Sequence, residues 1–267
     1  MHPIERLRYV ARAHGADAES LVRETAGALR GLGIDPSGLV VACRRIVERH
    51  PTCGPLWWLC ARLLTSADPM AAARAAVAEI EADRTADVLA AELRDGATVA
   101  TVGWPAITGQ ALARRGDLRV LAVDAGHQTT SFVQRLERSD VECELVPPEA
   151  AAVASADADV VLVEADALAP SRVVAPVGSA VLAAVAGIPG TPVWVVAGCG
   201  RRLPSPMVEF IAARLDGDDY WTREAELIPM SLVSHIVGQA GRLPATAPGA
   251  VRAECEMAPE LLRTSPM

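Results

Sequence analysis

Apolar residues recur at helical spacing through the first third of the chain. The pattern predicts helices over residues 4–11, 20–33, 39–47, 55–64 and 70–90. A stripe of apolar positions three and four residues apart is the side of a helix that packs against a core. Residues 1–85 are therefore expected to form a small N-terminal helical domain. The densely apolar segment 55–64 is expected to pack against the rest of the protein.

Beyond this region the apolar period changes to that of buried strands. Short β-branched and apolar runs predict strands over residues 98–102, 118–123, 143–146, 160–163 and 192–197. Helical segments separate them, as in right-handed βαβ units that build a parallel sheet. The predicted fold class is α/β, with a Rossmann-type parallel sheet flanked by helices over residues 86–245. Residues 246–267, rich in Pro and Ala, are expected to be a C-terminal arm or a partly disordered tail.

Residues 159–182 combine a strand with the features of a ligand site. The strand is an uninterrupted run of Val and Leu, typical of a strand covered on both faces, and it ends in Glu164 and Asp166. Gly178 and Ser179 then open an alanine-rich helical run. Ligands of open α/β sheets gather where strands end and helices begin, because free backbone N–H groups point there. This segment is therefore the predicted site.

Composition narrows the class of protein. The apolar fraction of 51% in 267 residues allows a full core, but Asp, Arg, Pro or Gly interrupt the most apolar segments. No membrane span is therefore expected, and the N-terminus lacks the apolar core of a secretory signal, so a cytoplasmic protein is predicted. The net charge is −8, with acidic and basic residues interspersed. This argues against direct nucleic-acid binding, which needs a basic surface.

Several cofactor chemistries are excluded or not expected. All 25 basic residues are Arg, so there is no Lys for a Schiff base or for a Walker-type phosphate site. Gly103 follows a strand, but no Gly-x-Gly-x-x-Gly motif occurs there, and a nicotinamide cofactor is not expected. The six cysteines form no Cys-x-x-Cys pair and the five histidines form no ligand-spaced cluster. We therefore predict reduced, mainly buried thiols, and we expect neither a metal nor a cofactor.

A series of landmarks appears in a fixed order along residues 85–240. They are Asp-Gly-Ala-Thr-Val at 95–99, Asp-Ala-Asp-Val-Val-Leu-Val-Glu-Ala-Asp at 157–166, Val-Gly-Ser at 177–179, Pro-Val-Trp-Val-Val-Ala at 192–197 and the segment 226–237. In order and spacing they resemble the initiation factor 2B alpha/beta/delta-subunit superfamily. That superfamily includes methylthioribose-1-phosphate isomerase and ribose-1,5-bisphosphate isomerase. The resemblance implies the same Rossmann-type domain and a homodimer through the C-terminal domain.

The resemblance also implies positions for a catalytic pair. In the isomerases of this family, a Cys at the end of the first strand and an Asp at the end of the fourth flank the sugar phosphate. An aldose–ketose interconversion needs one group that takes a proton and another that donates one. Asp166 falls on the Asp position. The Cys position falls at or beside Gly103, next to Trp104, and neither residue is a cysteine.

Other departures from the family pattern lie around the same site. Ala175 and Pro176 replace the Asn-Lys that precedes the family's Gly-Thr turn, and the segment after the second strand contains His127 but no Arg. Glu164 stands where the family usually has a small Gly, which adds a carboxylate where a phosphorylated sugar would sit. Phosphate binding is therefore expected to be weakened.

Each candidate residue has a structural interpretation beside the functional one. Asp166 is a catalytic base or a strand-end carboxylate that accepts backbone N–H groups from the next turn. Gly178 and Ser179 form an anion-binding helix start or an ordinary N-cap. His127 replaces a lost acid/base group or lies in a solvated loop.

The loop after the last predicted strand adds three candidates. Cys199 is a structural thiol, or a reactive one whose pKa is lowered by the neighbouring Arg201 and Arg202. The two arginines are also the best remaining side-chain ligands for a phosphate.

Two functions follow from these observations. The first is an initiation factor 2B-like protein that keeps the fold, has lost the isomerase pair and serves in ligand sensing or assembly. The alternative is a divergent isomerase of a phosphorylated ribose derivative that uses Asp166 with His127 or Cys199. A phosphorylated sugar or nucleotide is the expected ligand in either case, and a transferase on the same sheet has no motif in its favour.

Overall fold

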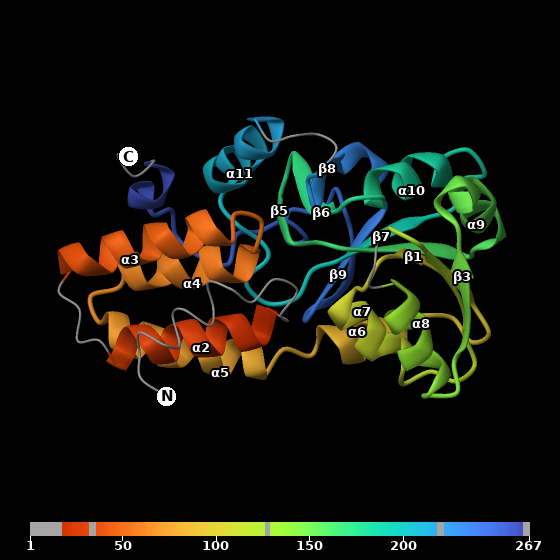
Figure 1. Ribbon diagram of the computed structural model, residues 1–267, viewed down its shortest axis with the longest axis horizontal. Helices are drawn as coiled ribbons and strands as arrows, with labels where there is room; N and C mark the ends of the chain where they lie inside the picture. Colours follow the sequence, from red (N-terminus) through yellow and green to blue (C-terminus); the bar gives the residue numbers. More distant parts are fainter. Residues whose placement is uncertain (1–17, 32–35, 126–128, 218–221, 264–267) are drawn as a thin grey trace.

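The structure is a computed structural model that describes residues 18–31, 36–125, 129–217 and 222–263. It places a helical domain beside an α/β domain (Figure 1). The predicted fold class is confirmed: a mostly parallel sheet is flanked by helices and preceded by a helical domain. The predicted helix at residues 4–11 lies outside the described residues.

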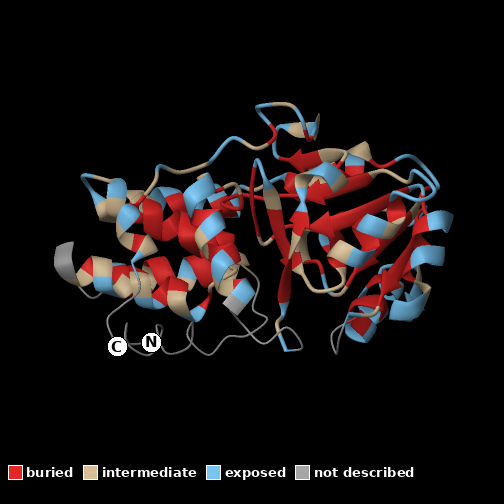
Figure 2. Cartoon of the chain, turned by 90° about the horizontal axis from the view of Figure 1, so that it is seen from above, coloured by how far each residue is buried: buried red, intermediate tan, exposed pale blue. Residues whose placement is uncertain are grey.

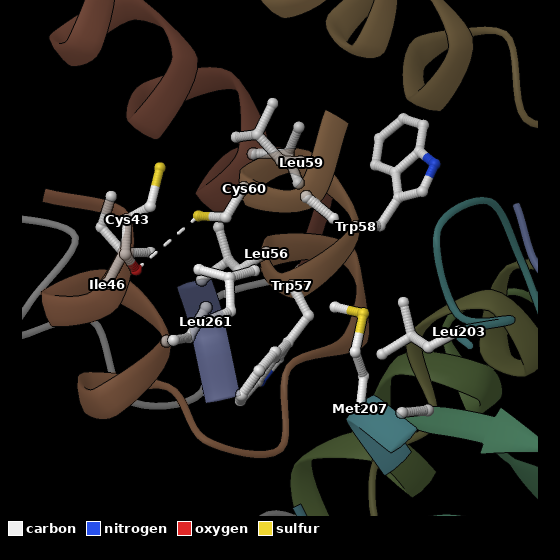
Figure 3. Packing of buried hydrophobic residues seen from close by; sticks show 14 of the residues in the cluster. Cys43, Ile46, Leu56, Trp57, Trp58, Leu59, Cys60, Leu203, Met207 and Leu261 are labelled. Carbon is white, nitrogen blue, oxygen red and sulfur yellow. Dashed lines mark hydrogen bonds between the residues drawn. The ribbon is translucent and has the colours of Figure 1, made fainter. Parts of the chain in front are cut away.

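The helical domain is organised around one buried helix. Its helices are α2 (Ala18–Gly31), α3 (Pro36–Arg49), α4 (Gly54–Thr65) and α5 (Pro69–Glu81). α4 contacts the other three, and both of its tryptophans, Trp57 and Trp58, are fully buried. Leu203 and Met207, from the segment that leads into α11 (Ser205–Gly217), pack against it (Figure 3). The prediction that 55–64 packs against the rest of the protein is confirmed.

The single helix predicted over 70–90 is wrong, because the structure has two helices there. α5 ends at Glu81, and α6 (Thr85–Glu92) begins after a short break. Asp83 lies in the break and its Oδ1 accepts the backbone N–H of Thr85 at 2.9 Å and the hydroxyl of the same residue at 2.6 Å. Such local side-chain bonds compete with helical hydrogen bonds and favour a new helix start.

The large sheet has the strand order of a Rossmann fold. Its strands are β1 (Thr98–Val102), β2 (Arg119–Val123), β3 (Glu142–Val146), β4 (Val160–Glu164), β7 (Val193–Val196), β9 (His235–Gly238) and β10 (Gly241–Pro244). The order is β10-β9-β7-β4-β1-β2-β3, and among the described strands of this sheet only β10 is antiparallel. From β1 the chain adds β2 and β3 on one side of the sheet and then β4, β7 and β9 on the other side. The boundary between β1 and β4 is therefore the switch point of the sheet, the position where such folds bind ligands.

Both faces of this sheet are covered (Figure 1). α6, α7 (Ala106–Leu112) and α8 (Thr129–Glu137) share a core with one face, and α9 (Ala151–Asp157) and α10 (Ser179–Ala186) with the other. β4 contributes Val161 and Val163 to one core and Val160 and Leu162 to the other. Its uninterrupted apolar sequence follows from this, because successive side chains of a strand point to opposite faces.

A second, small sheet was not expected from the sequence. It consists of β5 (Ala167–Ala169), β6 (Arg172–Pro176) and β8 (Ala225–Pro229), paired antiparallel in that order. Ala167, Ala169 and Val174 belong to the same buried cluster as α4 and α11. The small sheet therefore connects the end of β4 to the core of the helical domain, and Figure 2 shows buried positions on both sides of this contact.

The C-terminal segment reaches back to the helical domain but is packed rather than disordered over residues 246–263. Ala258 and Leu261 are buried in the helical core. The indole N–H of Trp58 donates to the carbonyl of Glu254 at 3.2 Å, and Arg44 Nε donates to the carbonyl of Glu260 at 2.7 Å. The tail was expected to be mobile because it is rich in Pro and Ala, but these contacts hold it in place.

None of the helices in the described ranges combines the length and the apolar character needed to cross a membrane.

The contact between the two domains depends on Gly54. Its N–H donates to the backbone oxygen of Asp166 at 3.0 Å, and a Cβ at this position would lie 2.3 Å from that oxygen. We expect Gly54→Ala to lower the free energy of unfolding by about 2 kcal/mol, because the backbones must move apart. Urea denaturation measures the loss. Gly116→Ala is the matched control, since its Cβ would lie an ordinary 3.7 Å from the nearest atom; equal stability of the two variants would contradict the prediction.

Candidate functional site

The candidate site lies at the carboxyl ends of β1 and β4. The two strands pair with Ala100 opposite Val161, and the same register places Gly103 opposite Glu164. Gly103 has a φ of +65°, and a Cβ there would meet no atom of the described residues within 4 Å. Among these residues, the β1 side of the switch point, where the family position of the Cys falls, has open space.

Glu164 is held inside the protein on the β4 side. The residue is only 8% exposed, and its Oε2 accepts the backbone N–H of Thr108, in the first turn of α7, at 2.9 Å. Its Oε1 lies 3.0 Å from Nη2 of Arg201, which is 7% exposed and also donates to the carbonyl of Ala165. Glu164 therefore forms a buried ion pair, and its carboxylate occupies one backbone donor in the first turn of α7.

A second carboxylate occupies the start of α10. Gly178 is the N-cap with φ of +95°, and a Cβ there would come within 3.2 Å of the Cβ of Ala125. Ser179 is buried, and the N–H of Ala180 donates to Oε1 of Glu226 at 2.7 Å. Glu226 comes from β8 and is itself buried. The helix start predicted to bind an anion is therefore capped by a side chain of the protein.

The loop after β7 has its donors satisfied in the same way. The N–H of Cys199 donates to Oδ2 of Asp83 at 2.7 Å. Arg202 pairs with Glu254 at 3.0 Å through Nη1, and its Nε donates to the carbonyl of Ala250 at 2.9 Å. Arg201 and Arg202 are therefore both bonded to carboxylates of the protein. Their role as phosphate ligands remains a prediction that would require them to leave these partners.

Of the two interpretations of Cys199, the pKa of its thiol favours the structural one. Burial raises the pKa of this thiol to about 12, and the nearby carboxylates of Glu254 and Asp83 add to the shift. The two neighbouring arginines do not offset it, because their guanidinium groups are engaged with Glu164 and Glu254. Cys199 is therefore a structural thiol at neutral pH.

Asp166 differs from the other acidic residues of the site. Its backbone is fixed by Val174 and Gly54, but its half-buried carboxyl accepts no hydrogen bond from any described residue. Burial raises its pKa to about 7; Arg201 opposes this shift and Glu164 adds to it. One interpretation of Asp166 was a strand-end carboxylate that accepts backbone N–H groups from the next turn. Among the described residues, no such bond to its carboxylate is formed. A carboxyl that titrates near neutral pH suits proton transfer.

Cys53 is a residue of this site that sequence reasoning missed. It is the N-cap of α4 and precedes Gly54, whose N–H bonds to the backbone of Asp166. Burial raises the pKa of its thiol to about 11; the backbone N–H of Leu56 and the charge of Arg201 oppose the shift, and Asp166 adds to it. The only local signal was a Cys-Gly-Pro helix start, which says nothing about a partner in the other domain.

Two further predicted residues stand apart from this cluster. Trp104 is 37% exposed and its ring lies 6.2 Å from that of Phe132 in α8. Its role in binding substrate stays a prediction. His127 lies outside the described residues. Within the described ranges, no group of three or more His, Cys, Asp or Glu side chains is arranged to hold a metal ion.

No protein-family model matches the chain, and no curated protein matches its sequence. Solved structures do match its fold. The Pyrococcus horikoshii translation initiation factor eIF-2B aligns over 94% of this chain and 98% of its own, with a TM-score of 0.74 and 19% identity. The tetrameric eIF2B-beta2-delta2 complex from C. thermophilum aligns over 91% and 90%, with a TM-score of 0.74 and 13% identity.

The eIF2B delta protein from Chaetomium thermophilum is similar over 89% of this chain and 96% of its own, with a TM-score of 0.69 and 14% identity. The chain therefore has the fold of the eIF2B proteins over nearly its whole length. The expected resemblance to the initiation factor 2B alpha/beta/delta-subunit superfamily is confirmed at the level of the fold. At such identities the likeness assigns no residue a role.

The raised pKa of Asp166 predicts a pH-dependent stability. An Asp in an unfolded chain has a pKa of about 3.9, so the folded state binds this proton more tightly. The resulting stability is complete below pH 4 and is lost as the pH rises through about 7. We expect Asp166→Asn, which stays neutral, to be more stable than the wild type at pH 8, by about 1–3 kcal/mol, and not at pH 4.

Urea denaturation from pH 4 to pH 8 measures this difference. Asp216→Asn, at an exposed position of α11, is the matched control and should follow the wild type at every pH. A constant difference between Asp166→Asn and the wild type across this range would show that the group does not titrate as described.

Proposed function

We propose that the chain is an initiation factor 2B-like protein with a degenerate sugar-phosphate isomerase site and a regulatory or assembly role. The observation that carries the proposal is the occupation of both helix starts at the switch point by carboxylates of the chain. Glu164 is bound to Thr108 and Arg201, and Glu226 is bound to Ala180. These are the groups that an anionic ligand would otherwise contact.

The energetic argument concerns the Glu164–Arg201 pair. A phosphate that reached Arg201 would have to displace Glu164 and leave its buried carboxylate without a cation. Breaking a buried ion pair in this way costs about 3–5 kcal/mol, which removes about two to nearly four orders of magnitude of affinity. A phosphorylated sugar or nucleotide would therefore have to bind without the two best cations of the site. This supports a role that does not require turnover of such a ligand.

The second candidate function is a divergent aldose–ketose isomerase. The observation in its favour is Asp166, whose carboxyl has no hydrogen bond to the described residues and a pKa of about 7. A group that must give and take protons at neutral pH works best with a pKa near that value. The stability of the fold does not require a carboxyl at position 166, because an Asn there would make the folded protein more stable at neutral pH.

The two candidates differ in the reaction of the purified protein with sugar phosphates. We expect no turnover of ribose 1,5-bisphosphate or methylthioribose 1-phosphate, followed by phosphorus NMR. Turnover that is abolished by Asp166→Asn and retained by Glu209→Gln would overturn the regulatory role and establish the isomerase. Glu209 is the matched control because it lies on α11, where its carboxylate pairs with Arg172 at the surface.

We also propose a homodimer through the C-terminal domain, located in the cytoplasm. The free state of all six cysteines supports a reducing compartment. The outer side of α10 and the turn after it support self-association: Val181 of α10 is 55% exposed, and Ile188, two residues past the end of this helix, is 83% exposed. Val153 of the adjacent α9 is 70% exposed. A surface helix that is apolar on both sides is expected to be covered. One of the similar solved structures is itself a tetrameric complex.

A second copy of the chain is the occupant that fits this surface. α10 carries no charged residue, and the Asp157 of α9 pairs with Arg119. Two chains of charge −8 would approach most easily through such an uncharged surface.

The dimer can be tested at this surface. We expect the wild type to be a dimer by light scattering after size exclusion, and the double variant Val181→Glu/Ile188→Glu to be a folded monomer. Two carboxylates placed in an apolar interface would have to be desolvated without partners. Val41→Glu is the matched control, since Val41 is a 46% exposed valine on α3. A monomeric wild type, or the same dissociation in the control, would contradict this interface.

A further inference from the structure

One arginine side chain fastens the last strand of the large sheet. Among the described strands, the four-residue β10 pairs only with β9. Its Arg242 makes two further contacts. The guanidinium lies 4.3 Å from the centre of the Trp194 ring, in β7, and its Nε donates to Oε2 of Glu92, in α6, at 3.1 Å. Arg242 therefore ties the edge strand to the middle of the sheet and to the helix that covers it.

His235 lies beside the same indole ring. It is the first residue of β9, and the centre of its ring is 6.1 Å from that of Trp194, with 65° between the ring planes. Arg242 stands opposite Val237, two residues further along β9. Because side chains two residues apart on a strand point to the same face, His235 and Arg242 are diagonal neighbours. Their face is the one that α6 covers.

The hydrogen bonds of Ser234 decide which nitrogen of His235 takes up a proton. The single hydroxyl hydrogen of Ser234 is donated to the carbonyl of Val193 at 2.7 Å. Its oxygen, 3.2 Å from Nδ1 of His235, can then only accept a hydrogen from that nitrogen. The neutral ring therefore carries its hydrogen on Nδ1, and Nε2 is the site of protonation.

The charges around this ring favour its neutral form. The charged groups that face it are Arg242, from β10, and Glu92, from α6, while its neighbour on β7 is the uncharged Trp194. Burial and the charge of Arg242 lower the pKa of His235, and Glu92 opposes the shift. Because Glu92 is already paired with Arg242, a protonated His235 would add a second cation beside one carboxylate.

We propose that His235 makes the contacts of Arg242 a pH-sensitive latch, which holds β10 on the sheet at neutral pH and loosens it as the pH falls. Protonated His235 repels the guanidinium of Arg242 and competes with it for Glu92. The latch acts on more than one strand, because the chain continues from β10 into residues 246–263, which pack against the helical domain.

Hydrogen exchange of β10 tests the latch in the full chain. Its peptides are followed by mass spectrometry at pH 7.5 and pH 5.0, and the wild-type rate is divided by that of His235→Gln, which stays neutral. The pKa of His235 is lower in the folded protein than in an unfolded chain, where it is about 6.5. The stability it contributes is therefore complete above this value and is lost as the pH falls. We expect the ratio of rates to rise about twofold to fivefold from pH 7.5 to pH 5.0.

Two controls separate the latch from a general loosening of the fold. Arg242→Gln removes the cation that protonated His235 repels, so in this background the ratio measured with and without His235→Gln should be the same at both pH values. β3, the opposite edge strand of the sheet, should show no change of the ratio in any variant. The titration of Asp166 in the same range affects both rates and cancels in the ratio.

Three results would overturn the latch. They are a ratio at β10 that does not rise at pH 5.0, a rise that persists in the Arg242→Gln background, and an equal rise at β3.

Discussion

The buried ion pair between Glu164 and Arg201 is the constraint on which the site depends. It joins the end of β4, the loop after β7 and, through Thr108, the start of α7. Two charges out of water are tolerated only when each is paired and its remaining bonding groups are satisfied, as they are here. Because the pair consumes the cation nearest to Asp166, that carboxyl has neither a partner nor full solvation. Burial raises the pKa of the Asp166 carboxyl, and Arg201, which is bonded to Glu164, opposes this shift only in part.

The second determinant is the position of the helical domain. Its core continues through the small antiparallel sheet into α11, so α4 and the end of β4 are held in one apolar cluster (Figure 3). This packing presses Gly54 onto Asp166 and brings Cys53 with it. The helical domain thus fixes the backbone at the end of β4, next to the carboxylates on which the proposed function rests.

Local patterns predicted those parts of the fold that local interactions decide. The alternation of buried strands and helices predicted the parallel sheet, and the strand-end position of Asp166 placed the site at the switch point. The break between α5 and α6 was missed, because Asp83 competes with the helix through its side chain in a segment with strong helical periodicity. The small sheet was missed because β5 has only three residues and because β8, the second partner of β6, comes from a segment far along the chain. The two interpretations of Cys199 could not be separated in the sequence, because it does not show that the neighbouring arginines are bonded to Glu164 and Glu254.

The sequence by itself determined the class of fold, the parallel pairing expected of its first strands and the residues available at the strand ends, because hydrophobic periodicity and the lengths between strands are local properties. It also excluded chemistries that need lysine. Only the tertiary structure decided how those residues are used. Glu164, Glu226 and Glu254 find their donors through contacts between distant segments, and Gly54 meets the backbone of Asp166 across a domain contact. Partner choice among charged groups depends on burial and on distances in space, and neither is a property of neighbouring positions along the chain.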